Sequence, residues 1–156
     1  RLDDLPRLTY TEMVIKEAMR LYPPAWSLTR QTVDEVDIGG YPIGKGKVVV
    51  VNIYGMHRDA RYFPDPDRFD PERFSPENEK LIPKYAYLPF GGGPRVCIGN
   101  AFAMMEAKLV VATIARQFHL ALAPGQQVKP ERVFTLRSKY GMRMVATERQ
   151  PEAMLV

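Results

Sequence analysis

Apolar and polar residues recur with a helical period over residues 9–21 of the chain. The doublet Pro23-Pro24 follows, and it should end this helix because proline lacks the amide hydrogen that a continuing helix needs. Thr9 and Glu12 have the spacing of a capping box, in which the two side chains bond to each other's backbone amides. We therefore expect the helix to begin with a side-chain cap at Thr9.

Short β-type runs separated by glycine turns lie between residues 33 and 53. The turns at Gly39-Gly40 and around Lys45 predict a small antiparallel sheet. The longest helical pattern covers residues 100–118, and residues 119–145 are again β-like. These segments predict a mainly α-helical fold with small antiparallel β-sheets, which is an α+β class.

A proline-rich stretch with interspersed aromatic residues lies between residues 62 and 89. Its prolines interrupt regular structure, while its aromatic side chains are able to fix it to a core. We therefore expect an ordered meander instead of a flexible linker. The expected anchoring residues are Phe63, Phe69, Phe74 and Tyr85.

Composition and charge narrow the possible classes of protein. Of the 156 residues 46% are apolar, which suffices for the core of one domain. The net charge of +4 would suit a nucleic-acid binder, but 18 acidic residues are mixed among 22 basic ones, which is typical of a solvated surface. A single cysteine cannot form an internal disulfide, so we expect a reducing, cytoplasmic location. The chain has no apolar run long enough to predict a membrane span.

The most informative motif is the string FGGGPRVCIG over residues 90–99, directly before the longest helical pattern. A sulfur at the beginning of a helix meets unpaired backbone N–H groups and the positive end of the helix dipole, which stabilise a thiolate. The glycines allow the backbone to pass close under a flat ligand. Arg95 carries a cation that is suited to pairing with a carboxylate.

Simpler interpretations of these residues are possible. A phosphate-binding loop fits poorly, because no Gly-Lys-Ser/Thr follows and Val96 stands where the third glycine of a dinucleotide motif belongs. A lone cysteine such as Cys97 is more often a small buried apolar residue, but the ten residues around it argue against that interpretation. His57 and His119 lack the context of a metal ligand or of a catalytic partner, so we expect them to be structural.

The pattern F-G-x-G-x-R-x-C-x-G is matched without a gap and resembles the cysteine loop of the cytochrome P450 superfamily. Two further motifs support the resemblance, Glu17-x-x-Arg20 in the first helix and PERF at residues 71–74 in the meander. Without the other motifs, Glu17 and Arg20 would be read as an ordinary i,i+3 pair on a helix. The resemblance implies that Glu17 and Arg20 join Arg73 in a buried charge cluster. It covers the chain from this helix to the terminal β-turn, and implies that residues 1–156 are the C-terminal haem-thiolate-binding part of a P450 domain whose N-terminal part is not in this sequence.

The resemblance also implies individual roles around a haem b cofactor. Cys97 would be the catalytic residue and the axial ligand of the iron. The other expected cofactor-binding residues are Arg30 and Arg95 at the propionates, Phe90 beside the thiolate, and Gly91 and Gly99 through their backbones. The expected substrate-contacting residues are Ala25, Trp26, Ser27, Leu28, Phe134 and Thr135.

The function that the resemblance implies is a monooxygenase, which inserts one oxygen atom from O2 into an apolar organic substrate. Its electrons would come from an acidic partner, a ferredoxin, a flavodoxin or a flavin reductase, and we expect Lys84, Lys108 and Arg116 to form the docking patch for it. Two alternatives remain. One is a peroxide-driven peroxygenase, against which the uninterrupted cysteine loop argues, and the other is a non-catalytic haem-binding fragment.

Overall fold

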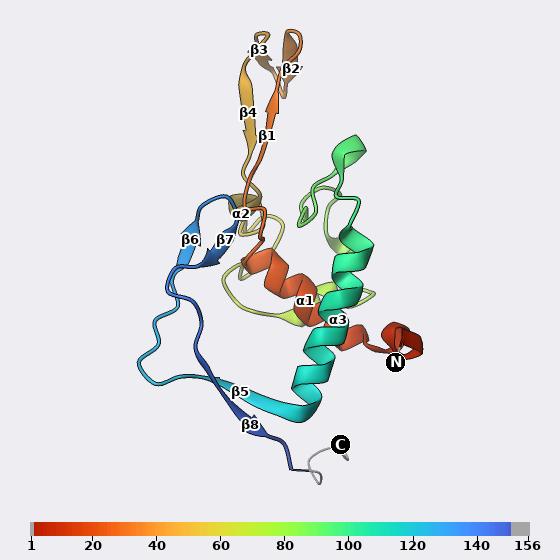
Figure 1. The fold of residues 1–156 in the computed structure, drawn as a ribbon. Coiled ribbons are helices and arrows are strands. Elements are labelled where there is room, and N and C mark those ends of the chain that lie inside the picture. Colours follow the sequence, from red (N-terminus) through yellow and green to blue (C-terminus); the bar gives the residue numbers. More distant parts are fainter. Residues whose placement is uncertain (1, 151–156) are drawn as a thin grey trace.

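The computed structural model describes residues 2–150 of the chain. Two long helices pack against each other, α1 (Thr9–Leu21) and α3 (Asn100–Gln117), and a long irregular segment connects the strands after α1 to α3 (Figure 1). Both helical patterns of the sequence are thereby confirmed. The remaining helical elements are short: the 3₁₀ helix η1 (Leu2–Arg7), the helix α2 (Ile53–Met56), and the 3₁₀ turns η2 (Pro71–Phe74), η3 (Glu79–Leu81) and η4 (Gly93–Arg95).

The beginning of α1 differs from the expectation. Its N-cap residue is Leu8, and no side chain caps the helix, so the predicted capping box is wrong. The Glu12 carboxylate is used elsewhere, because it accepts a hydrogen bond of 2.8 Å from Nζ of Lys108 on α3 and pairs with Lys16 at 3.1 Å. The ion pair with Lys108 therefore joins the two helices where the sequence suggested a local cap.

The strands after α1 form a projecting double hairpin (Figure 1). Strand β1 (Leu28–Gln31) pairs antiparallel with β4 (Val48–Val51), and β2 (Val36–Ile38) pairs antiparallel with β3 (Tyr41–Ile43). The Thr32 hydroxyl links the two ladders by donating to the carbonyl of Gly44 at 2.7 Å. The predicted small antiparallel sheet is confirmed as two separate ladders.

The residues after α3 form two more antiparallel ladders, as the β-like pattern predicted. Strand β5 (Phe118–Leu122) continues directly from α3 and pairs with β8 (Met144–Glu148). Strand β6 (Pro130–Arg132) pairs with β7 (Leu136–Ser138). This last hairpin returns to the residues after α1, since the Leu136 amide donates to the Pro24 carbonyl at 2.9 Å.

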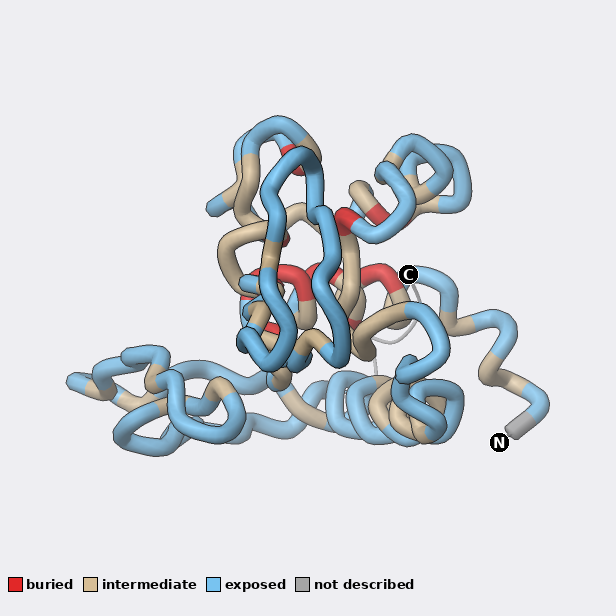
Figure 2. The backbone as a smooth tube through the Cα atoms, turned by 90° about the horizontal axis from the view of Figure 1, so that it is seen from above, coloured by how far each residue is buried: buried red, intermediate tan, exposed pale blue. Residues whose placement is uncertain are grey.

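The buried residues gather around α1 and the meander (Figure 2). Phe63 and Phe74 are buried, but Phe69 and Tyr85 are exposed, so the prediction of meander anchors was half wrong. Tyr85 adopts a left-handed backbone conformation with φ of +70°. Tyr87 serves as an anchor instead: its ring lies 4.7 Å from that of Phe74, and its hydroxyl donates to the Lys16 carbonyl at 2.9 Å.

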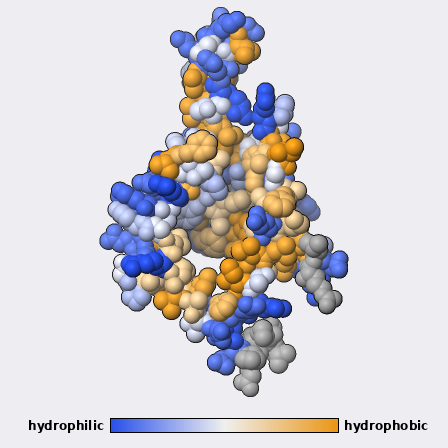
Figure 3. Space-filling view, in the orientation of Figure 1, coloured by the Kyte–Doolittle hydropathy of each residue, from blue (hydrophilic) through white to orange (hydrophobic). Residues whose placement is uncertain are grey.

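Large apolar side chains remain exposed outside this core, and apolar surface is visible over much of one face (Figure 3). Within the described residues no side chain of α3 is buried. Ile98, before α3, and Phe134, in the β6–β7 turn, are essentially fully exposed. No helix among residues 2–150 has the length and apolar character needed to cross a membrane.

Candidate functional site

Cys97 lies in a tight loop that leads directly into α3. Its amide donates to the Phe90 carbonyl at 3.0 Å, and the Val96 amide donates to the Gly93 carbonyl at 3.1 Å. Its own carbonyl accepts from the amide of Asn100, the first residue of α3, at 3.4 Å. These bonds close the loop on itself and leave the Cys97 residue exposed. A thiol held in this way is accessible to a ligand.

The backbone geometry favours glycine at two positions of this loop and packs it closely at a third. Gly91 and Gly93 have φ angles of +74° and +69°, which side chains rarely allow. A Cβ at Gly92 would lie 3.1 Å from Cδ2 of Leu88, so the loop runs close against the residues that precede it. The expected backbone position Gly99 is the N-cap residue of α3, where a Cβ would lie 3.9 Å from Sγ of Cys97.

A hollow of about 310 Å³ lies beside the glycines of the loop. Arg30 on β1 lines this hollow, and its Nη1 donates to the Thr29 carbonyl at 2.8 Å. Arg95 in η4 is exposed and does not line it. The lining residues are Leu28, Arg30, Val51, Tyr85, Leu88, Gly92 and Gly93.

The Arg20 guanidinium is completely buried and bonded on every side. It forms a bidentate pair with Glu17, with Nε to Oε2 at 2.7 Å and Nη2 to Oε1 at 2.8 Å. Its other N–H groups donate to the carbonyls of His57 at 2.8 Å, Pro66 at 2.7 Å and Arg68 at 3.1 Å. All five donors of the side chain are therefore used, which offsets the cost of burying a charge.

Arg73 lies at the rim of this cluster. Its Nε is 3.5 Å from Oε1 of Glu17 but makes no hydrogen bond, while its Nη2 donates to the Asp65 carbonyl at 2.9 Å. The Glu17 carboxylate instead accepts from the Asp70 amide at 2.9 Å. The structure brings Glu17, Arg20 and Arg73 together, but the Glu17–Arg20 contact is much closer than the contact with Arg73.

His57 occupies a position that sequence reasoning did not foresee. It is completely buried, its Nε2 accepts the Leu88 amide at 2.8 Å, and its ring lies 5.2 Å from that of Tyr87. Burial lowers the pKa of His57 to about 4, and the charges of Arg20 and Arg58 act in the same direction. No local sequence signal marks this position, because His57 directly follows the short helix α2 and its contact is with Leu88, far along the chain. His119, by contrast, is exposed on β5.

The two expected substrate-contacting segments lie next to each other. Nε1 of Trp26 donates to the carbonyl of Val133 at 2.9 Å, which holds residues 25–28 against the turn that carries Phe134 and Thr135. The Phe134 side chain is 99% exposed. These segments therefore share one region, and Leu28 also lines the hollow beside the glycines.

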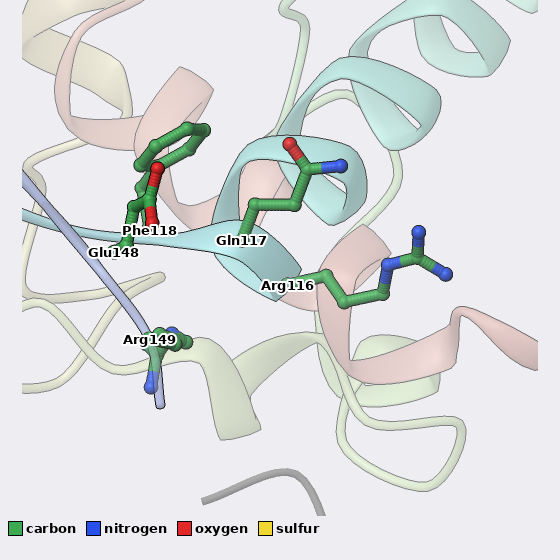
Figure 4. A pocket seen from close by; sticks show the side chains of 5 residues that line it. All are labelled: Arg116, Gln117, Phe118, Glu148 and Arg149. Atoms are coloured by element: carbon green, nitrogen blue, oxygen red, sulfur yellow. The ribbon is translucent and has the colours of Figure 1, made fainter. Parts of the chain in front are cut away.

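The three basic residues expected to form a docking patch are separated. Lys108 is 16% exposed and is paired with Glu12. Arg116 lies at the end of α3 away from Cys97, beside a hollow of about 480 Å³ lined also by Gln117, Phe118, Glu148 and Arg149. The Arg116 side chain points away from Glu148 and Arg149 (Figure 4). The expected patch is thus wrong as a unit, and Lys84, near the glycine loop, is its exposed member on the cysteine side.

The chain is similar to known proteins in both sequence and structure. The sequence model of the cytochrome P450 family matches residues 1–143. Cyclooctatin synthase of Streptomyces melanosporofaciens is 43% identical over 130 residues, covering 83% of this chain and 28% of that protein. Pentalenene oxygenase of Streptomyces avermitilis is 37% identical over 149 residues, covering 96% of this chain and 33% of that protein. The crystal structure of the cytochrome P450DA heme domain matches with a TM-score of 0.90 at 31% identity, covering 97% of this chain and 33% of that one. The chain spans about a third of the length of such relatives.

We expect Arg20→Ala to destabilise the full-length protein more than Arg73→Ala. Removing Arg20 leaves the Glu17 charge buried without its bidentate partner, which costs about 3–5 kcal/mol. Arg73 is 11% exposed in its side chain and makes one hydrogen bond to a carbonyl, so its loss should cost on the order of 1–2 kcal/mol. Urea unfolding measures both values, and Arg61→Ala, at an exposed ion pair, is the control. Equal losses for Arg20→Ala and Arg73→Ala would contradict this expectation.

Acid should destabilise the full-length protein through His57. The folded protein keeps His57 neutral down to a pKa of about 4, whereas the unfolded chain takes up the proton near the ordinary histidine pKa of 6.5. Protonation thus favours unfolding, and the free energy of unfolding should fall by on the order of 3 kcal/mol as the pH drops from 6.5 to 4. Urea titrations across this range should show that His57→Gln removes this part of the slope. The control His119→Gln should keep it, and an unchanged slope in His57→Gln would refute the assignment.

Proposed function

This chain belongs to the cytochrome P450 superfamily, and from that premise we propose that residues 1–156 are the C-terminal haem-binding part of a longer monooxygenase. The observation that carries the proposal is Cys97, which is exposed in a loop closed by backbone bonds at the beginning of α3. The family and the matched heme domain imply haem b as the cofactor. The coverage of about a third of each relative supports a longer enzyme, and the coding sequence on either side of this segment tests that point.

The residues of the site fit a haem. A flat macrocycle needs a backbone without side chains beneath it, and the loop offers three consecutive glycines, two of them in conformations that side chains rarely adopt. The Cys97 sulfur would bind the iron of such a haem. Arg30, beside the glycines, and Arg95, in η4, are cations that could pair with the propionates. Phe90 would pack beside the sulfur, because its carbonyl already holds the Cys97 amide.

The proposed reaction is the insertion of one oxygen atom of O2 into a C–H bond of an apolar organic substrate, while two electrons from a redox partner and two protons from solvent reduce the other atom to water. When bound, the haem supplies the redox chemistry that activates O2. Cys97 contributes an anionic sulfur that donates electron density, and the N–H groups at the beginning of α3 stabilise that anion. The names of two relatives, cyclooctat-9-en-7-ol 5-monooxygenase and pentalenene oxygenase, support an oxygenase.

The substrate would meet this chain at the two segments joined by the Trp26 bond to Val133. Phe134 is exposed there and offers an apolar surface, as do Ala25 and Leu28. Ser27 and Thr135 add polar groups that could orient an oxygenated carbon. Replacing Phe134 with Ala in the full-length enzyme should change substrate affinity without changing haem content, and a loss of haem would contradict this role.

The central test of the proposed function is Cys97→Ser in the full-length enzyme. We expect the variant to lose the red-shifted absorption band of the ferrous carbon-monoxide complex, because that band requires an anionic sulfur bound to the iron. An alcohol stays protonated near neutral pH and is a far weaker donor, so oxygen activation should fall even where haem stays bound. His119→Ala, at an exposed histidine, is the control and should keep the band. An unshifted wild-type band, or full turnover in Cys97→Ser, would overturn the assignment.

We also propose an acidic electron-transfer partner, a ferredoxin, flavodoxin or flavin reductase, that docks on the cysteine side in the cytoplasm. Lys84 is exposed there, next to Tyr85, whose ring lies against Gly92. The rate of reduction should fall with rising salt, because the Debye length shrinks from about 10 Å at 0.1 M to about 3 Å at 1 M. Stopped-flow reduction should show a slower rate for Lys84→Ala at low salt. Arg116→Ala, at the other end of α3, should behave as the wild type, and a salt-independent rate would exclude such docking.

A further inference from the structure

His57 connects the buried charge cluster to the cysteine loop through two hydrogen bonds. Its carbonyl accepts from Nη1 of Arg20 at 2.8 Å, and its Nε2 accepts from the Leu88 amide at 2.8 Å. The residue is completely buried, with the Tyr87 ring 5.2 Å and the Phe63 ring 6.3 Å from its own. A side chain enclosed in this way has little conformational freedom. Arg20 therefore fixes the position of His57, and His57 fixes the position of the Leu88 amide.

Leu88 is the residue from which the cysteine loop starts. Its carbonyl accepts the Gly91 amide at 3.1 Å, and its Cδ2 lies 3.1 Å from where a Cβ on Gly92 would be. Two residues later the Phe90 carbonyl accepts the Cys97 amide at 3.0 Å. The amide, the carbonyl and the side chain of Leu88 thus all make contacts within this region. A shift of Leu88 would therefore move the whole loop.

The hydrogen bond fixes the protonation of the histidine ring. Because Nε2 accepts a hydrogen from the Leu88 amide, it carries none itself, and the proton of the neutral ring lies on Nδ1. The charged groups that face the ring are Arg20 and Arg58, both cationic, and they disfavour an imidazolium. The ring is therefore an acceptor near neutral pH, a role that a protonated imidazolium or an apolar side chain could not fill.

On the basis of the proposed function, we propose that His57 is a positioning residue for the iron ligand: its Nε2 holds Leu88 so that Cys97 stays aligned with the charge cluster of α1. The arrangement differs from simple packing because it depends on one acceptor atom. A side chain that fills the space without an acceptor at this place would leave the Leu88 amide unpaired inside the protein.

Two amide variants of the full-length holoenzyme separate the acceptor from the packing. The oxygen of the longer side chain in His57→Gln is able to reach the place of Nε2, whereas the shorter side chain in His57→Asn is not. In His57→Asn we expect hydrogen exchange of the amides at residues 88–97 to be about tenfold faster than in the wild type. The red-shifted carbon-monoxide band should also disappear faster during incubation. His57→Gln should restore both properties to near wild-type values.

Each result decides for or against the inference. Equal exchange rates in the two variants, or wild-type rates in His57→Asn, would show that the acceptor is not needed. If neither variant folds, residue-resolved exchange of the wild type decides: a Leu88 amide as protected as the amides of α1 supports the inference, and an unprotected one overturns it. If the wild type lacks the red-shifted band, the proposed function fails, while the exchange rates still test the contact between His57 and Leu88.

Discussion

The structure depends on the hydrogen bonds that one buried cation, the Arg20 guanidinium, makes with its neighbours. Arg20 comes from α1, its anionic partner Glu17 lies one helical turn before it, and its remaining donors hold three carbonyls of the segment around the meander. Those carbonyls belong to residues 57, 66 and 68, which have no regular secondary structure of their own to hold them. A coil that has only turn-type backbone bonds of its own is thus tied to α1 by the donors of a single side chain.

The hydrogen bonds around Arg20 also determine where the cysteine loop lies. The segment fixed by Arg20 contains His57, which binds the amide of Leu88, and Leu88 leads into the glycines. On the other side the loop is continuous with α3, which is joined to α1 by the pair of Lys108 with Glu12. The sulfur therefore lies between two connections to the same helix. Its exposure does not imply mobility, because the backbone on both sides is held.

Local patterns in the sequence predicted the two helices, the hairpins and the cysteine motif, since those depend on residues close together in the chain. The resemblance to the P450 superfamily added the grouping of Glu17, Arg20 and Arg73, which no spacing could have given. Contacts between distant residues were missed. The capping box failed because Glu12 pairs with Lys108, almost a hundred residues later, and the meander anchors were misassigned because a left-handed Tyr85 turns outward and Tyr87 packs in its place. The buried acceptor at His57 was likewise invisible, because its partner lies 31 residues away.

The double hairpin has a consequence for how the chain assembles. Strands β1 and β4 form a ladder of only two strands in the described part of the chain, so each has an outer edge whose amide and carbonyl groups are not bonded within that ladder. Two-stranded ribbons are marginally stable in water, and open edges invite the addition of further strands. Val48 and Val50 expose apolar side chains along this ribbon. This ribbon therefore has open edges at which a further strand can pair. The alternation of its unbonded amide and carbonyl groups sets the register that such a strand must adopt.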